Sequence, residues 1–383
     1  MNIAIITPGV NNLPVPAVSG GAVETLITSF IRQNELVGNH FITVYASWSM
    51  EAESSSRLFK KAKFIFVRTD TAFYKISKFI RYIIRRIFKI HIPNAFVANI
   101  KIKKSDYDAV VIENRPDYGE YFQSVGNLYL HLHNDLKISK ESSNAFKKII
   151  TVSNFITEIV KKNHPKAHVV TLYNGIDAKK FINVTFSKYA DTFREKFDIN
   201  DNSFVILYTG RITPQKGVKE LIEAYKRLRH DSKLILVIAG SSVFGKTKID
   251  DYRKSLVSLA KTSSNKVVFT GYIPHEVLPE VYALSNLIVI PSVWDDPSPL
   301  TVYESLATGK QLIVTDSGGI PEIVYKSNAI MVNRGSKLIE QLSSCMQKAI
   351  DSNINDIDTL NISVASQYSY ENYYNNFINL LNS

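Results

Sequence analysis

This chain of 383 residues contains a single cysteine and no long apolar run. One cysteine, Cys345, excludes an intrachain disulfide framework and a cysteine-rich zinc site, and is typical of a reducing compartment. No apolar stretch approaches the roughly 20 residues that a membrane-spanning helix needs. The N-terminal sequence MNIAIITPGV lacks the charged and long apolar regions of a signal peptide. We therefore expect a cytoplasmic protein.

The chain also lacks internal repeats, low-complexity tracts and any sequence signature of RNA or DNA binding, so nucleic acid is not an expected partner. Hydrophobic residues make up 45% of the chain and charged residues 21%, as in ordinary globular proteins. The net charge of +11 favours anionic partners such as nucleotide phosphates or acidic lipid surfaces.

Short apolar runs rich in valine and isoleucine alternate with stretches of helical character. In the first half we expect strands at residues 3–7, 41–46, 63–68, 108–112, 128–133, 149–153 and 169–173, and helices at 21–37, 74–90 and 153–163. In the second half we expect strands at 204–209, 234–239, 267–270, 287–291, 312–315 and 329–332, and helices at 219–228, 249–261, 277–284, 301–308 and 337–351. This alternation predicts an α/β protein with doubly wound parallel sheets.

The two series meet in a polar stretch at residues 174–203, which has no strong period. We interpret this stretch as a linker, because the length of the chain suggests two domains. The tyrosine-rich tail at residues 368–381 predicts a terminal helix that is packed rather than free.

Polar motifs follow five of the apolar runs in the second half. They are YTGRITPQKG from Tyr208, VIAG ending at Gly240, FTGYI around Tyr272, PSVWDDPSPLTVYE ending at Glu304, and SGGIPE ending at Glu322. Since the carboxyl ends of parallel strands meet at one edge of a sheet, these motifs collect where α/β proteins bind ligands. Their cations, glycines, helix starts and carboxylates suit a phosphorylated, hydroxyl-rich ligand such as a nucleotide sugar.

Arg211 and Lys216 lie in the loop after the first of these strands. An arginine offers a planar fork of donors to phosphate oxygens, a lysine offers a compact charge, and the helix that starts after Gly217 also attracts anions. The alternative is two surface cations in a turn.

Asp296 and Glu304 flank a predicted helix start, so that both carboxylates could face one site and accept from sugar hydroxyls. The backbone N–H groups of Leu300 and Thr301 would then face a diphosphate. The alternative is a charge arrangement that only favours the helix dipole.

Two features of the first half complete the candidate site. Gly20 and Gly21 precede a helix in a glycine-containing loop, which is either a ligand-binding loop or an ordinary turn. His131 and His133 end an apolar strand on the same face, which suits a substrate contact or a buried structural role. A metal site is not expected here, because the sequence shows no third ligand at a sensible spacing.

Residues 74–90, YKISKFIRYIIRRIFKI, form a strongly amphipathic helical pattern with one basic side. The pattern is compatible with a helix lying on an anionic membrane surface and equally with a core-facing helix that has a solvated basic side.

These motifs resemble the retaining glycosyltransferases of family 4, within the glycosyl transferases group 1, most densely from Tyr208 to Glu322. The resemblance implies the GT-B fold: two doubly wound Rossmann-like domains with a cleft between them. It implies an N-terminal acceptor-side domain at residues 1–177, completed by a C-terminal helix at 366–383, and a donor-binding domain at 178–365.

The resemblance also assigns roles to residues. His133, with His131 second, lies near the donor sugar; Arg211 and Lys216 hold the diphosphate; Asp296 contacts the sugar. These residues, His133, Arg211, Lys216 and Asp296, are the implied catalytic set. The implied donor-binding residues are Gly20, Gly21, Gly210, Arg211, Lys216, Gly240, Tyr272, Ile273, Asp296, Pro299, Leu300, Thr301 and Glu304. The sequence departs from the family pattern in having Asp296 for glutamate and Ser298-Pro299 for Phe-Gly.

The implied activity is transfer of a sugar from a nucleotide-diphosphate sugar to an acceptor hydroxyl with retained configuration, without metal or other cofactor. Expected partners are the donor, a glycan or lipid-linked acceptor in bacterial-type surface polysaccharide or glycolipid synthesis, and an anionic membrane surface through residues 74–90. The alternatives are a non-catalytic nucleotide-sugar-binding protein and a sugar-nucleotide epimerase of related fold. A phosphorylase-like enzyme is a further alternative, for which no pyridoxal-binding lysine is identified.

Overall fold

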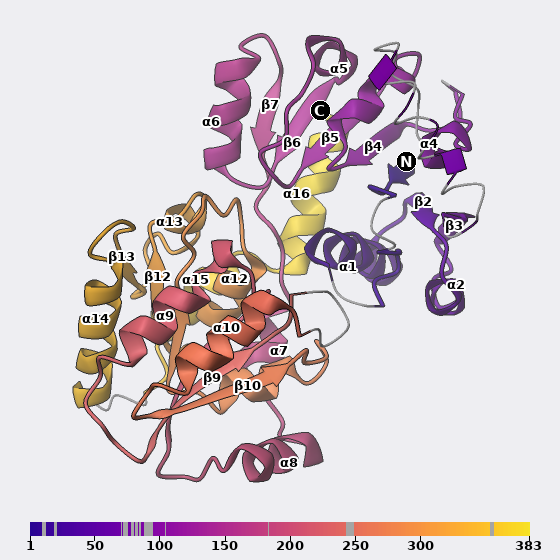
Figure 1. Cartoon of the computed structure of the whole chain (residues 1–383). Helices are drawn as coiled ribbons and strands as arrows, with labels where there is room; N and C mark the ends of the chain where they lie inside the picture. The colour runs from indigo at the N-terminus through magenta and orange to yellow at the C-terminus, as the bar shows by residue number, and fades with distance from the viewer. Residues whose placement is uncertain are drawn as a thin grey trace. The chain divides into compact units, whose positions relative to one another are not determined.

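A computed structural model describes residues 1–9, 13–18, 21–69, 71, 76–77, 80, 83, 86–87, 95–103, 105–182, 184–242, 249–352 and 356–383. The chain divides into two compact units (Figure 1). Unit 1 contains Met1–Asn174 and Tyr370–Ser383, and unit 2 contains Gly175–Ser369. The expected domain boundaries, after residues 177 and 365, lie within a few residues of these divisions.

Unit 1 is built on a seven-stranded parallel sheet with the order β3-β2-β1-β4-β5-β6-β7. Its strands are β1 (Asn2–Ile6), β2 (Phe41–Ser47), β3 (Ala62–Val67), β4 (Ala109–Glu113), β5 (Leu128–Leu132), β6 (Lys148–Thr151) and β7 (Val169–Thr171). β1 pairs with both β2 and β4, so the direction of winding reverses between β1 and β4. Ligands of open α/β sheets bind beside the carboxyl ends of strands at such a switch point.

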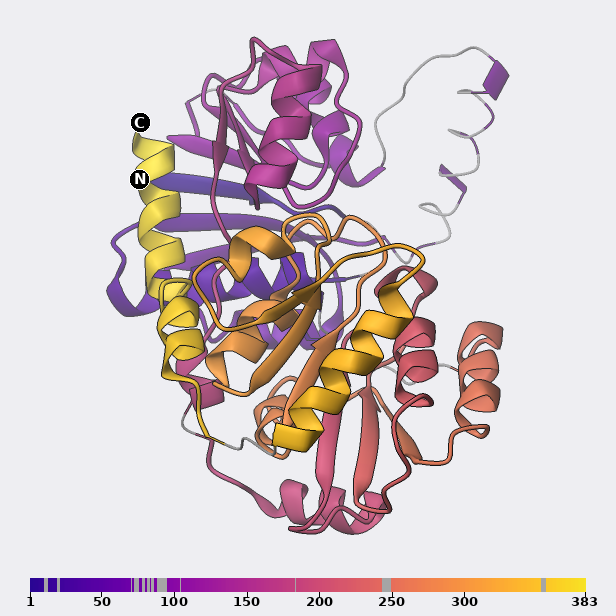
Figure 2. The same ribbon diagram turned by 90° about the vertical axis from the view of Figure 1, so that its left-hand side faces the viewer.

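The helical segments of unit 1 are α1 (Ala22–Val37), α2 (Met50–Ser56), α4 (Ala95–Ala98), η1 (Pro116–Tyr121), α5 (Lys140–Ala145), α6 (Asn154–Asn163) and α16 (Tyr370–Asn382). Figure 2 shows α16, in yellow, beside the indigo and purple strands of unit 1. Its aromatic side chains are buried on α1: the ring of Phe30 lies 5.1 Å from Tyr374 and 5.2 Å from Phe377. The tyrosine-rich tail is therefore part of the core of unit 1.

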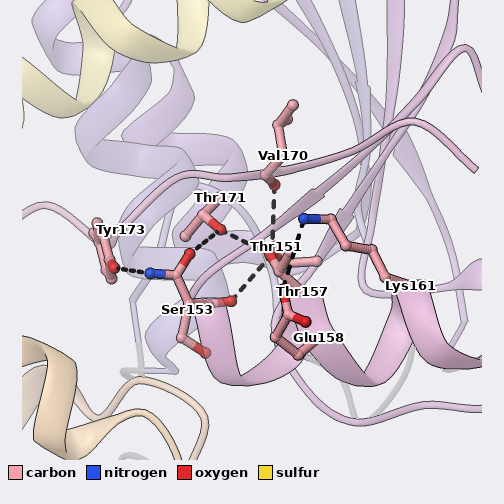
Figure 3. A network of polar contacts seen from close by, with 9 residues as sticks. Thr151, Ser153, Thr157, Glu158, Lys161, Val170, Thr171 and Tyr173 are labelled. Carbon is pink, nitrogen blue, oxygen red and sulfur yellow. Dashed lines mark hydrogen bonds and ion pairs between the residues drawn. The ribbon is translucent and has the colours of Figure 1, made fainter.

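A chain of hydroxyl and amide groups joins α6 to the carboxyl ends of β6 and β7 (Figure 3). The hydroxyls of Thr157 and Thr171 lie 2.7 Å apart, and Thr171 donates to the Asn154 side chain at 2.8 Å. Asn154 in turn donates to the Tyr173 hydroxyl at 2.8 Å. Ser153 caps α6 by accepting from the N–H of Ile156. These contacts fix where the helix begins.

Unit 2 repeats the plan with a six-stranded parallel sheet of order β10-β9-β8-β11-β12-β13. Its strands are β8 (Phe204–Thr209), β9 (Leu234–Ala239), β10 (Lys266–Gly271), β11 (Leu287–Ile290), β12 (Gln311–Thr315) and β13 (Ile330–Val332). Alternate residues of β8 enter different cores: Val205 and Leu207 on one face, Ile206 and Tyr208 on the other. Both faces are covered, and the predicted doubly wound α/β fold is confirmed.

The helical segments of unit 2 are α7 (Ala178–Ile182), α8 (Lys188–Phe197), η2 (Pro214–Lys216), α9 (Val218–Tyr225), α10 (Asp251–Ala260), α11 (Leu278–Ala283), α12 (Leu300–Ala307), α13 (Ile320–Ile323), α14 (Leu338–Ser352) and α15 (Thr359–Ser366). Two of them, α7 and α8, correct the interpretation of residues 174–203 as a domain linker. Phe181 of α7 and Phe193 of α8 enter the core of unit 2. Ser187 caps α8, and its backbone N–H also donates to Glu280 at 2.9 Å. In α8, Tyr189, Phe193 and Phe197 recur every four residues behind the capping serine, a helical signal that sequence reasoning overlooked.

Most of the amphipathic pattern at residues 74–90 lies outside the described residues. Among the helices that are described, none combines the length and the apolar character needed to cross a membrane.

Candidate functional site

In unit 2 the predicted site residues gather at the carboxyl ends of the strands, where β8 lies between β9 and β11. Gly210 and Gly240 directly follow β8 and β9 and have φ angles of 140° and 152°. A Cβ on Gly240 would lie 1.8 Å from the carbonyl oxygen of Gly210. Only glycine lets these two backbones meet so closely, so Gly240 shapes this edge by having no side chain.

Lys216 and Asp296 meet at the switch point of unit 2. Lys216 ends the short helix η2 after β8, and its Nζ forms an ion pair with Oδ2 of Asp296, in the loop after β11. The loops are held together by Gly217, whose φ is 70° and where an added Cβ would lie 1.8 Å from the carbonyl oxygen of Pro291. Asp296 is 4% exposed, and Ser292 donates to its Oδ2 at 3.3 Å.

The loop after β12 clamps the backbone of Asp296. The backbone N–H of Asp296 donates to the hydroxyl of Ser317 at 3.2 Å, and the backbone carbonyl of Asp296 accepts from the N–H of Gly319 at 2.9 Å. The Ser317 hydroxyl also donates to the carbonyl oxygen of Trp294. The S-G-G motif thus positions the acidic motif that precedes α12.

The start of α12 is a candidate anion site. Pro299 occupies the N-cap position and provides no capping side chain, and the first turn contains no acidic residue. The first N–H groups of a helix have no intrahelical partner, so those of Leu300 and Thr301 are suited to binding phosphate oxygens.

Glu304 projects from the same helix and is 5% exposed. Its Oε2 accepts from the Tyr282 hydroxyl at 3.0 Å, and its Oε1 lies 3.3 Å from Nε2 of His275. The hydrogen bond to Glu304 raises the pKa of His275 despite burial. Sequence reasoning missed both partners: His275 lies two residues beyond the FTGYI motif after β10, and Tyr282 lies within the helix α11. They hold Glu304 in one orientation, with lone pairs left to accept further donors.

The remaining predicted residues of unit 2 differ in their exposure to solvent. Arg211 is exposed, and its carbonyl accepts from the Tyr208 hydroxyl at 2.7 Å. Tyr272 is half-buried after β10, whereas Ile273 is 8% exposed and belongs to the hydrophobic core. The structure thus joins Lys216 to Asp296 directly and places the other residues on the same edge of the sheet.

In unit 1, Gly21 precedes α1 with a φ of 107°, and Gly20 lies outside the described residues. An added Cβ on Gly21 would lie 2.3 Å from Oε2 of Glu24, a carboxyl that is 5% exposed. Burial raises the pKa of Glu24 to about 7, and the charge of Glu113 adds to the rise. Sequence reasoning missed Glu24, which the glycine loop brings to the switch point of unit 1.

Glu113 ends β4 beside the two predicted histidines, His131 in β5 and His133 directly after it. Its Oε2 lies 2.8 Å from Nε2 of His133 and 3.0 Å from Nδ1 of His131. All three residues are buried, and their ligand-type atoms lie within 4.8 Å of one another, a grouping that could hold a metal ion. This corrects the expectation that no third ligand lies nearby; the signal was a glutamate that directly follows the apolar run AVVI.

The electrostatics of this cluster favour a neutral His133 beside an ionised Glu113. Burial alone would raise the pKa of Glu113, but attraction by the imidazoles and the hydrogen bond from His133 outweigh it and lower the pKa to about 2. Burial and repulsion from His131 lower the pKa of His133 to about 4.

Residues 190–354 match the family model described as glycosyl transferases group 1. The chain is 28% identical over 370 residues to YtcC of Bacillus subtilis, named as a candidate glycosyltransferase, covering 91% of this chain and 83% of that protein. It is 29% identical over 234 residues to lipopolysaccharide 1,2-N-acetylglucosaminetransferase of Salmonella typhimurium, covering 60% of this chain and 57% of the relative.

Among solved structures, Anabaena HepE in complex with UDP-glucose superposes with a TM-score of 0.71 at 16% identity, covering 100% of this chain and 99% of that one. A glycosyltransferase from Rickettsia africae has a TM-score of 0.71 at 17% identity, covering 99% and 97%. At such identities the likeness establishes the fold alone. Residues 190–354 of unit 2 therefore resemble the glycosyl transferases group 1, and the chain as a whole has the GT-B fold of glycosyltransferases.

Proposed function

We propose that the protein is a retaining glycosyltransferase that moves a sugar from a nucleotide-diphosphate sugar to an acceptor hydroxyl, in the synthesis of a surface polysaccharide or glycolipid. The observation that carries the proposal is the meeting of Lys216 and Asp296 at the switch point of unit 2, next to the uncapped start of α12. The lipopolysaccharide-related relative supports a glycan acceptor, and the UDP-glucose complex of a neighbour supports a nucleotide-sugar donor.

Donor binding is proposed for unit 2. Lys216, Arg211 and the first N–H groups of α12 take the diphosphate, because cations and helix starts both favour anions. Glu304, held by Tyr282, accepts hydrogen bonds from the ribose hydroxyls. The half-buried Tyr272 lines the base pocket, with Ile273 supporting it from the core, and Asp296 accepts from hydroxyls of the transferred sugar.

The proposed chemistry requires no protein nucleophile. The bond between the anomeric carbon and the diphosphate oxygen breaks, and its electron pair goes to that oxygen. Lys216, Arg211 and the start of α12 stabilise the charge that develops on the leaving group, an electrostatic effect that often dominates catalysis. The acceptor hydroxyl then forms its bond from the same face and passes its proton to a phosphate oxygen, which accounts for retention of configuration.

His133 of unit 1 is proposed to contact a sugar hydroxyl. No divalent ion is needed to neutralise the diphosphate, because the two cations of unit 2 supply the charge. Peripheral membrane attachment through residues 74–90 is a separate proposal that rests on the sequence pattern, and flotation with anionic and neutral vesicles tests it.

A donor panel tests the main proposal. Uridine, guanosine and adenosine diphosphate sugars are titrated by calorimetry against the wild type and Lys216→Ala. We expect one nucleotide to bind the wild type and to lose affinity in the variant, and the bound donor to be consumed when an acceptor glycan is added. Binding without any transfer or hydrolysis would favour a non-catalytic nucleotide-sugar-binding protein, and a changed sugar on an intact nucleotide would favour an epimerase.

A further inference from the structure

Two hydrogen bonds of Asn114 connect the ends of β4 and β5 and fix Glu113 and His133 relative to each other. The N–H of Asn114 donates to the carbonyl of His131 at 2.7 Å, and the N–H of His133 donates to Oδ1 of Asn114 at 3.1 Å. Asn114 adopts a left-handed φ of 53°, a conformation that asparagine tolerates better than most residues. The two strand ends therefore present their side chains in one arrangement.

Within this arrangement, the hydrogen bond between the side chains determines which ring nitrogen of His133 carries a proton. An ionised carboxylate can only accept, so Nε2 of His133, 2.8 Å from Glu113 Oε2, is the donor. In a neutral imidazole the other nitrogen, Nδ1, then has a free lone pair. The low pKa of His133 is consistent with a neutral ring at physiological pH.

The two histidines differ in what they offer to a substrate. Both ring nitrogens of His131 are sealed from solvent, and its Nδ1 contact with Glu113, at 3.0 Å, is not aligned as a hydrogen bond. His133 keeps 8% of its surface exposed, and its Nδ1 has no hydrogen-bond partner among the described residues. His133 is therefore the member of the pair that can reach a ligand.

We propose that Glu113 is a positioning residue, which holds His133 with its proton on Nε2 so that Nδ1 is presented as a hydrogen-bond acceptor for a hydroxyl of the sugar substrate. The inference rests on the proposed transferase function and deepens it, because it assigns the atom of His133 that acts and the direction of its hydrogen bond. No proton is transferred: the substrate hydroxyl keeps its proton and donates a hydrogen bond to Nδ1.

A metal ion bound by Glu113, His131 and His133 is the competing explanation for the cluster. Ligand atoms around a tetrahedral zinc ion, with bonds of about 2.0–2.1 Å, stand ~3.3 Å apart. The observed separations from Glu113 Oε2, 2.8 and 3.0 Å, are shorter and fit a proton between the atoms of the first pair. The 2.8 Å contact fits the hydrogen bond, and the metal content of the protein tests the alternative.

Two substitutions of His133 separate its two nitrogens. In His133→Gln the amide reaches the position of Nε2 and keeps a donor for Glu113, but nothing replaces Nδ1. In His133→Asn the carbonyl oxygen takes the position of Nδ1, but the contact with Glu113 is lost. We expect His133→Gln to be the more stable variant and His133→Asn to have the higher turnover, with His133→Gln reduced by roughly 10- to 100-fold. The opposite ranking in turnover, following stability, would mean a structural role.

Imidazole ¹⁵N–¹H spectra of the free wild-type protein test the tautomer without any activity. We expect His133 to be protonated on Nε2 from pH 6 to 8 and, in Glu113→Gln, to gain a population protonated on Nδ1. A wild-type His133 protonated on Nδ1, or stoichiometric metal that disappears in His133→Gln, overturns the inference. If the spectra agree but no nucleotide sugar is a substrate, the proposed transferase function fails and the inferred acceptor role fails with it; an active enzyme with the other tautomer fails the inference alone.

Discussion

The two switch points of this protein have the same topology and opposite chemistry. In each unit the first strand lies between the second and the fourth, and polar residues gather where these strands end. Unit 1 places the buried carboxyl of Glu113 beside two imidazoles, and the charge of Glu113 acts on a second buried carboxyl, Glu24. Unit 2 places Lys216 and an uncapped helix start at the same point.

The cations near the two switch points are also used differently. Arg115, which follows β4 in unit 1, is paired with Asp117 at 2.5 Å and also donates to the carbonyl of Pro8. Lys216 in unit 2 is paired with Asp296, the carboxylate that is proposed to accept from hydroxyls of the transferred sugar. Both members of this ion pair therefore belong to the proposed site. The fold thus provides two equivalent positions, and the residues at the strand ends decide that one suits a diphosphate and the other suits hydroxyl groups.

The largest expected effect is the loss of the cation that distinguishes unit 2. Lys216→Ala removes a donor to the leaving diphosphate, and we expect kcat to fall by roughly 10²-fold in initial-rate assays. Lys219→Ala is the matched control, since Lys219 is 58% exposed on α9 and pairs with Glu223 only at the surface. Near-normal rates in Lys216→Ala would place the diphosphate elsewhere.

A smaller effect is expected from the carboxylate of α12. Glu304→Gln keeps the shape of the side chain but weakens the hydrogen bonds that the proposed ribose hydroxyls make to a charged acceptor. We expect the donor Kd to rise about tenfold, with kcat changed less. Calorimetry with the nucleoside diphosphate alone measures this, and an unchanged Kd would remove Glu304 from the ribose site.

The sequence predicted much of this comparison, though not all of it. Apolar runs such as LILVIA of β9 predicted the parallel strands. The polar motifs after those runs drew attention to Lys216 and Asp296, in loops that follow β8 and β11, and to His133, which directly follows β5. Glu113 followed the same rule and was overlooked. Tyr282, which orients Glu304, was beyond prediction, since the contact joins separate helices. The burial of Glu24 could not be predicted either, because it depends on tertiary contacts with the glycine loop and with the neighbouring strand β4.

The raised pKa of Glu24 predicts a pH dependence that belongs to unit 1. Its folded-state pKa of about 7 exceeds the ordinary value of 4.5, so its stabilising contribution is complete below pH 4.5 and is lost as the pH rises through 7. We expect Glu24→Gln to raise the stability at pH 8 by about 1–3 kcal/mol and to change it little at pH 4.5. Denaturation at both pH values measures this; an equal effect at both would contradict the assignment.

A still smaller effect is expected where the chain terminus returns to unit 1. Tyr374→Phe removes a hydroxyl that donates to Asn34 at 2.8 Å but keeps the ring packed on Phe30. The lost hydrogen bond should cost about 1 kcal/mol of unfolding free energy. Because α16 belongs to unit 1, nucleotide binding to unit 2 should be unchanged, and a parallel loss of binding would show that the units are energetically coupled.

The smallest expected effect is none. If Lys216, Arg211 and the start of α12 neutralise the diphosphate, a chelator has no ion to remove from unit 2, and turnover in excess EDTA should stay within about twofold of the untreated rate. A loss of turnover that added metal restores would contradict this, and the comparison of the two units shows where to look next. If Glu113→Gln abolished the metal response, the ion would belong to unit 1, and the imidazole cluster would be a metal site rather than a hydrogen-bond acceptor. If the response persisted in that variant, the ion would belong with the diphosphate, and the cations of unit 2 would be insufficient on their own.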